Sequence, residues 1–213
     1  MIAATVLMAA LAAPQEASTL LEEVRQAYSK VTTAKYQVKF ETTDPHMNHL
    51  KGTADVQFLR PHSAKVVISG PNGITKTVFC NGQNLTTVTK SGRKSSPFSL
   101  ETLSHLLPLN VETFAFLDWT HELSTEKGGA MFGSVISVTA SVWNEQKWTV
   151  IEEVNRVDDS LDRYYIGKDD HLIWRVEDMT ADGRTIFSDT RISGMKLGEP
   201  IPESTFESSN REK

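Results

Sequence analysis

The chain has 213 residues, of which 39% are hydrophobic and 23% charged, and its formal net charge is −5. This length suffices for a single domain with a substantial core. Because the charge is mildly acidic and no block of basic residues occurs, nucleic acid and an anionic membrane surface are poor candidates for a partner.

The first thirteen residues have the composition of an export signal. Met1 to Ala13 contain no charged side chain, and Ala10-Leu11-Ala12 matches the small-x-small pattern of a secretory cleavage site. We interpret residues 1–13 as a signal peptide, with a buried N-terminal helix as the alternative. The stretch is too short for a bilayer span, which needs about 20 apolar residues. Pro14 follows where a lipid-modified lipoprotein needs Cys, so we expect a soluble protein of the periplasm or another extracytoplasmic space.

A helix and a half-buried strand are expected next. From Thr19 the apolar residues recur with helical spacing, and Thr19 with Glu22 has the pattern of a capping box at the helix start. Beyond Thr32 the period changes to two, as in a strand with one wet face and one dry face. The helix stripe comprises Leu20, Leu21, Val24, Ala27, Tyr28 and Val31, and the dry face of the strand comprises Tyr36, Val38 and Phe40.

Further short strands follow to near the end of the chain, giving about ten in all. Asn81-Gly82 is a strong hairpin signal between two of them, and short polar turns separate the others. The expected strands are 52–60, 64–69, 74–80, 85–89, 135–143, 147–154, 161–166, 172–179 and 184–193. The single cysteine, Cys80, ends one of these strands, which excludes an internal disulfide and favours a half-buried structural thiol.

Two apolar helical pieces interrupt the strands. Leu100 to Trp119 carries large apolar residues at helical spacing, broken at Pro108, on a stretch with few charges. A curved sheet with one dry face needs a cover, so we interpret this segment as a helical lid. At the C-terminus, Pro200 to Phe206 is expected to cross the sheet edge as an extended segment. The expected organisation is one domain over residues 14–207 and a disordered tail over 208–213.

The order of these elements resembles the LolA/LolB-like periplasmic lipoprotein carrier superfamily. The resemblance lies in a first helix, a Gly-x-x-Asp-Val-x-Phe-x-Arg-Pro strand, a Val-x-x-x-Gly-x-x-Leu hairpin and a late buried Phe. The matching residues are Gly52, Asp55, Val56, Phe58, Arg60, Pro61, Val78, Gly82, Leu85 and Phe206. It covers nearly the whole mature chain. It implies an α+β, mainly β fold: an unclosed antiparallel half-barrel with an N-terminal helix and a helical lid, wrapped around an apolar cavity for acyl chains.

The expected ligand-binding residues form the apolar cavity and its lid. They are Tyr36, Val38, Phe40, Val56, Phe58, Val78, Leu103, Leu106, Leu107, Phe114 and Leu117. The alternative is that the same side chains form a solid core, and sequence alone does not separate the two. Pro61 is expected only to end its strand.

Motifs for catalysis and metal binding are weak. Asp44, His46 and His49 have ligand-type side chains but stand in a polar loop without a third firm ligand, so we interpret them as solvated. The paired acids 152–153, 158–159 and 169–170 are interpreted as solvated charge. Trp143 and Trp148 flank an expected hairpin and should pack across the strands. No nucleophile elbow, P-loop or dinucleotide fingerprint occurs, so no cofactor is expected.

These observations favour an exported carrier of an acylated lipoprotein or lipid, with membrane-bound donor and acceptor proteins as possible partners, rather than an enzyme. An envelope sensor or regulatory protein-binding module with the same shell is the alternative from another class. A hydrolase that uses the loop histidines is a further rival. Ligand identity and oligomeric state are left open.

Overall fold

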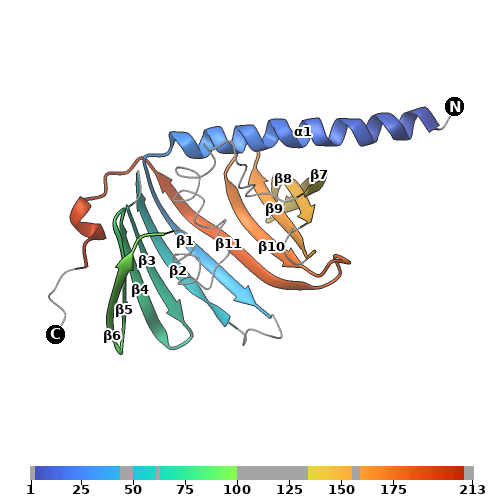
Figure 1. Cartoon of the computed structure of the whole chain (residues 1–213). Coiled ribbons are helices and arrows are strands. Elements are labelled where there is room, and N and C mark those ends of the chain that lie inside the picture. The colour runs from blue at the N-terminus through green and yellow to red at the C-terminus, as the bar shows by residue number, and fades with distance from the viewer. Residues whose placement is uncertain (1–2, 44–49, 61–62, 100–133, 155–158, 209–213) are drawn as a thin grey trace.

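The computed structural model describes residues 3–43, 50–60, 63–99, 134–154 and 159–208. The strands form one antiparallel, unclosed sheet in the order β6-β5-β4-β3-β2-β1-β11-β10-β9-β8-β7 (Figure 1). The first and last strands therefore meet in the middle, and β6 and β7 form the edges. The half-barrel of mainly β structure predicted from the sequence is confirmed.

One helix and eleven strands, with a short 3₁₀ helix near the C-terminus, make up the described fold. In chain order they are α1 (Ala3–Lys30), β1 (Thr33–Thr42), β2 (Leu50–Leu59), β3 (Ser63–Gly70), β4 (Gly73–Asn81), β5 (Asn84–Thr89), β6 (Gly92–Pro97), β7 (Ser134–Trp143), β8 (Gln146–Val154), β9 (Leu161–Gly167), β10 (Ile173–Met179), β11 (Ile186–Leu197) and η2 (Glu203–Phe206).

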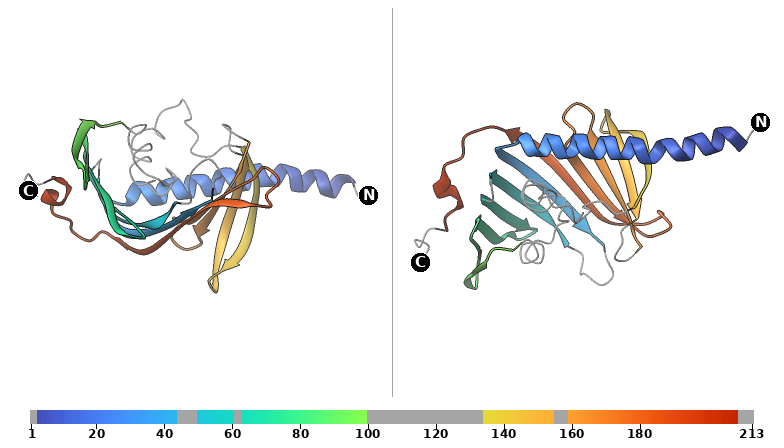
Figure 2. Two further views of the ribbon diagram at one scale, coloured as in Figure 1. Left: turned by 90° about the horizontal axis from the view of Figure 1, so that it is seen from below. Right: turned by 45° about the horizontal axis from the view of Figure 1, so that its top comes forward.

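The sheet is curved, and α1 crosses one end of its concave side (Figure 2). We call this side the inner face. Alternation along β1 places Tyr36, Val38 and Phe40 on it, each at most 5% exposed, while Gln37 and Lys39 point outward. One core cluster on this face takes side chains from α1 and from all the strands except the two edge strands, β6 and β7. The period-two pattern thus sets which face is dry.

The helix differs from the prediction at its start. α1 begins at Ala3 and includes Pro14, so Thr19 lies inside it and the expected capping box at Thr19 and Glu22 is wrong. Glu22 instead pairs with Arg25 and accepts a hydrogen bond from Gln26. The predicted apolar stripe is confirmed, since Leu20, Val24, Tyr28 and Val31 are all buried. Among the described residues, no helix combines the length and the hydropathy required for a membrane span.

Two other elements depart from the expectation. β6 was not predicted, because Gly92-Arg-Lys-Ser-Ser-Pro97 has no apolar alternation, and the strand is held at the edge by pairing with β5. The C-terminal segment forms η2 rather than running extended throughout, although Phe206 is buried as expected, at 3% exposure, beside β3 and β4. The predicted lid, Leu100 to Trp119, and the tail beyond Ser208 lie outside the described residues.

The outer face of β8 to β11 carries a network of charges that the sequence interpretation missed. Arg163 bridges Glu152 and Glu177, with Nε–Oε1 and Nη1–Oε2 distances of 2.8 and 3.2 Å. Arg175 contacts Glu177 at 2.5 Å and Asp189 at 2.9 Å. These residues share one face because the register places Glu152, Arg163, Glu177 and Asp189 side by side on neighbouring strands. The three arginines and three acids, including Arg191 on Asp189, balance in charge.

The prediction of solvated charge is therefore wrong for Glu152 and Glu153. As expected for neighbours in a strand, they point to opposite faces, but Glu152 belongs to the outer network and Glu153 is only 2% exposed on the inner face. Asp169 and Asp170 are exposed in the β9–β10 turn, in agreement with the prediction. Asp159 is also exposed, and Asp158 lies outside the described residues.

The predicted packing of Trp143 and Trp148 is confirmed. Their ring centroids lie 5.5 Å apart across the β7–β8 hairpin. Tyr165 and Trp174 extend the aromatic group, and the Arg175 guanidinium lies 5.0 Å from the ring centroids of both Trp143 and Tyr165. These rings lie together on the outer face of β7 to β10.

Candidate ligand-binding face

The structure brings together all the predicted ligand-binding residues that it describes. Tyr36, Val38, Phe40, Val56, Phe58 and Val78 lie on the inner face in one cluster. They come together because β1, β2, β3 and β4 are consecutive neighbours whose registers align their inward positions; Val56, for example, faces Tyr36 on one side and Val66 on the other. Leu103, Leu106, Leu107, Phe114 and Leu117 lie outside the described residues.

The residues of the Gly52–Pro61 motif now have physical roles. Gly52 pairs with Phe40, and a Cβ at Gly52 would overlap the Ser69 carbonyl oxygen and lie 2.8 Å from Phe40 Cζ, so the position needs a residue without a side chain. Asp55 points outward and accepts a hydrogen bond from Gln37 Nε2 at 3.0 Å. Val56 and Phe58 supply apolar surface to the inner face, and Pro61 lies outside the described residues.

Arg60 fastens the end of α1 to the end of β2. Its Nε donates to the Val31 carbonyl and its Nη2 to the Tyr28 carbonyl, both at 2.8 Å, while its backbone N–H donates to Thr32 O. The last carbonyls of a helix lack partners within the helix, and a cation there also favours the helix dipole. Partial burial lowers the pKa of the guanidinium, which remains charged. Arg60 therefore positions α1 over the inner face.

A second contact fastens α1 to the other half of the sheet. The buried Tyr28 hydroxyl accepts a hydrogen bond from the Ile173 backbone N–H, at 3.1 Å, where β10 begins. Burial raises the pKa of the Tyr28 hydroxyl well above its usual value, so the side chain stays neutral. Sequence reasoning assigned Tyr28 to the apolar stripe and did not find this polar contact.

The inner face is not entirely apolar. On β8 and β9, the Tyr164 hydroxyl donates to Glu153 Oε1 at 2.9 Å, and both side chains are at most 2% exposed. Asp162 lies beside Glu153 in the register and is 6% exposed. The face is therefore apolar over its β1–β5 half and has a polar end on β8 and β9.

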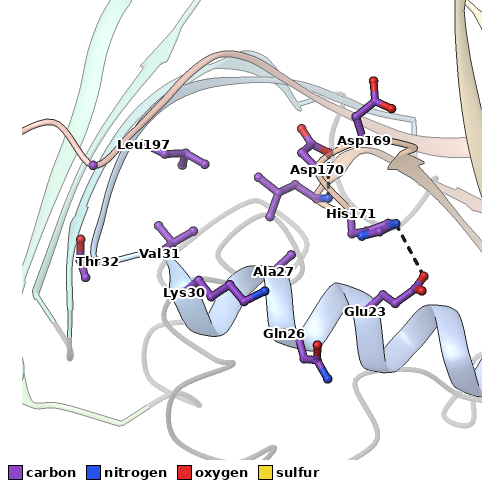
Figure 3. A pocket seen from close by; sticks show the side chains of 12 residues that line it. Glu23, Gln26, Ala27, Lys30, Val31, Thr32, Asp169, Asp170, His171 and Leu197 are labelled. Carbon is purple, nitrogen blue, oxygen red and sulfur yellow. Dashed lines mark hydrogen bonds and ion pairs between the residues drawn. The ribbon is translucent and has the colours of Figure 1, made fainter.

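A small pocket opens where α1 crosses the sheet. Its volume is about 630 Å³, and it lies between α1, the β9–β10 turn and the end of β11 (Figure 3). Ala27, Val31 and Leu172 line it together with several polar side chains, and His171 Nε2 lies 3.6 Å from Glu23 Oε2. The mixed lining suits a small polar molecule or water better than an acyl chain.

Sites for metal or nucleophilic chemistry gain no support from the described residues. Asp44, His46 and His49 fall within residues 44–49, outside the described part, and elsewhere in that part no group of three or more His, Cys, Asp or Glu side chains is arranged for a metal ion. Cys80 is a thiol on the inner face that is almost fully buried, at 1% exposure, rather than half-buried as predicted, and burial raises its pKa. A raised pKa disfavours the thiolate that nucleophilic chemistry requires.

Comparison with known proteins gives a fold but no close relative. No protein-family model and no curated protein matches the chain. Among solved structures, MucB aligns with a TM-score of 0.55 and 10% identity, over 92% of this chain and 64% of that one. The MucA/MucB complex of Pseudomonas aeruginosa aligns with a TM-score of 0.52 and 10% identity, over 91% and 61%. The Mycobacterium tuberculosis lipoprotein LppX aligns with a TM-score of 0.50 and 16% identity, over 87% and 98%.

These likenesses concern the fold, because all the identities are low. The chain spans less than two thirds of the length of MucB. A LolA superfamily protein from Nitrosomonas europaea is also matched, over 90% of this chain, with a TM-score of 0.42 and 13% identity. The half-barrel fold predicted from the sequence is confirmed by the likeness to MucB and LppX.

Proposed function

We propose that this chain is an exported binding protein that shelters the acyl chain of a lipid or lipoprotein against its inner face. The observation that carries the proposal is the apolar surface gathered on the concave side of the sheet. Besides the predicted residues, it includes Ala54, Ala64, Val66, Ile68, Cys80 and Leu85 on the half that runs from β2 to β5. Large and small side chains alternate along these strands, as Ala54, Val56 and Phe58 do on β2.

The free-energy cost of removing an acyl chain from a membrane requires such a surface. Moving an acyl chain out of a membrane costs about 0.8 kcal/mol per methylene, so a sixteen-carbon chain needs about 12 kcal/mol from its carrier. A dry, concave face offsets that cost, whereas a mixed pocket such as the one beside His171 does not. The predicted lid residues, Leu103 to Leu117, would complete the enclosure and open to release the chain.

The test combines lipid detection with a substitution that fills space. Protein purified from the envelope fraction should carry co-purified lipid in native mass spectrometry, and it should bind a fluorescent fatty acid. Ala54→Leu, on the inner face, should weaken that binding with little loss of thermal stability. Thr53→Leu, the adjacent position on the outer face, is the matched control and should bind normally.

The opposite outcomes refute the proposal. If Ala54→Leu instead lowers the stability of the ligand-free protein by about 1–3 kcal/mol, the inner face is a solid core without room for a chain. Absence of both co-purified lipid and fatty-acid binding leads to the same conclusion.

A second candidate is a regulatory module that binds a protein. It is supported by the likeness to MucB, a protein whose structure has been solved in complex with MucA. The same native spectra separate the two: a lipid carrier shows small-molecule adducts, whereas a protein-binding module shows a protein partner and no lipid.

Export rests on residues 1–13. The buried surface of α1 that the structure describes begins at Ala17, so cleavage after Ala13 would leave it intact. N-terminal sequencing of the mature protein should find its first residue near Pro14, and retention of Met1 would refute the assignment. Membrane-bound donors and acceptors of the ligand belong to the same proposal.

A further inference from the structure

The two edges of the sheet differ in how they are protected against pairing with another strand. β6 has six residues, two of them charged, Arg93 and Lys94, and it ends in Pro97. Short length, positive charge and proline are features that protect edge strands. β7 has ten residues, Ser-Val-Ile-Ser-Val-Thr-Ala-Ser-Val-Trp, with no charge and no proline. β7 therefore lacks these three protective features of β6.

β7 also exposes apolar surface. In the described part of the chain it pairs only with β8, and two of its large hydrophobic side chains are exposed, Ile136 by 51% and Val142 by 69%. A bulge between Val135 and Ser137 interrupts the pairing near the start of the strand. From Ser137 to Trp143 the register with β8 is regular, which leaves an uninterrupted edge of seven residues.

The sequence of this edge is complementary to itself. Val138 pairs with the inner-face residue Ile151, so Val138, Ala140 and Val142 lie on the inner side and Thr139 and Ser141 on the outer side. In an antiparallel pair of two identical edges centred on Ala140, Val138 faces Val142 of the second copy, and Thr139 faces its Ser141. Such pairs are favourable in sheets, and no like charges face each other.

We propose that two copies of this chain pair through β7, antiparallel, with a two-fold axis at Ala140. The pairing joins two half-barrels into one continuous sheet, satisfies the outward backbone groups of β7 and covers the exposed face of Val142. A two-fold pairing of this kind closes on itself and stops at the dimer. The proposal is independent of the ligand, since it uses none of the predicted ligand-binding residues on β1, β2 and β4.

The first test measures the oligomeric state by sedimentation velocity. The wild-type protein should form a dimer in the micromolar range. Val142→Lys places two lysines in each interface and should raise the dissociation constant at least tenfold. Ile74→Lys is the matched control, because Ile74 is a comparably exposed apolar residue, at 59%, on β4, which has neighbours on both sides; its dimer should be unchanged.

The second test measures the register. Facing residues of antiparallel strands have Cα atoms about 4.5–5.5 Å apart, within the range of a disulfide. Ala140→Cys should therefore give a disulfide-linked dimer under mild oxidation, whereas Ile74→Cys should not. The native Cys80 is 1% exposed and does not compete.

Three outcomes overturn the proposal. They are a wild-type protein that stays monomeric up to about 0.5 mM, a dimer that Val142→Lys leaves intact, and an Ala140→Cys variant that does not cross-link. A monomer that binds an extended peptide along β7 would show that the edge serves a different partner and would likewise refute the dimer.

Discussion

Replacing Arg60 by methionine tests whether the hydrogen bonds from its side chain to carbonyls at the C-terminal end of α1 hold this helix over the inner face. The variant keeps the backbone hydrogen bond to Thr32 but loses two side-chain bonds of 2.8 Å, to Val31 O and Tyr28 O. A hydrogen bond to a charged group contributes about 1.5–3 kcal/mol when buried, and a cation at a helix C-terminus about 0.3–1 kcal/mol. Because Arg60 is only partly buried, we take the low end and expect a loss of about 2 kcal/mol.

For a domain of this size, such a loss lowers Tm by about 4–8 °C, which differential scanning calorimetry measures. Arg60→Lys is the matched control: it keeps the charge but not the two-pronged geometry, so it should recover only part of the stability. Two results would refute the reasoning. If Arg60→Met melts with the wild type, the contacts contribute nothing, and if Arg60→Lys is fully stable, charge alone matters.

Two further predictions concern the motif glycine and the outer charge network. Gly52→Ala should destabilise the domain by about 1–3 kcal/mol in urea, because the new Cβ meets the Ser69 carbonyl and the Phe40 ring, whereas Gly70→Ala, which meets only the end of Thr75, should be mild. Burial raises the pKa of Asp189, but hydrogen bonds from Arg175 and Arg191 outweigh it and hold the pKa below 3.8. The stability from this group is therefore present above pH 3.8 and lost as pH falls through the lower, folded value. The stability gap between wild type and Asp189→Asn should be widest near pH 7 and narrow in acid; a gap independent of pH would contradict this.

The sequence predicted the strands whose side chains alternate between core and solvent. Tyr36, Val38 and Phe40 carry that signal plainly, and the Asn81-Gly82 turn fixes the next hairpin, since Gly82 has a φ of +82°. β6 escaped prediction because an edge strand can be polar on both faces. The early start of α1 was not predicted because its first residues were interpreted as a signal peptide, with a helix only as the alternative.

The sequence carried weaker signals for the contacts that position the candidate site. Arg60 and Tyr28 form hydrogen bonds with backbone groups of distant elements. No local sequence pattern indicates which carbonyl or N–H of another segment a side chain will meet. Glu153 did have a signal that was not used: it alternates with Ile151 on the dry face of β8, so burial of its carboxylate followed from the pattern. The predicted lid stays a prediction.

The pairing of the first strand with the last strand affects how the protein folds during synthesis. β1 pairs with β2 on one side and with β11 on the other, and β11 ends at Leu197. During synthesis, hairpins formed by β1 to β6 can form early, while one edge of β1 stays unpaired until β11 has emerged. Contacts between segments so distant in sequence form slowly, and an unpaired strand edge promotes misassembly. Nascent chains that stop before β11 should therefore be the aggregation-prone species.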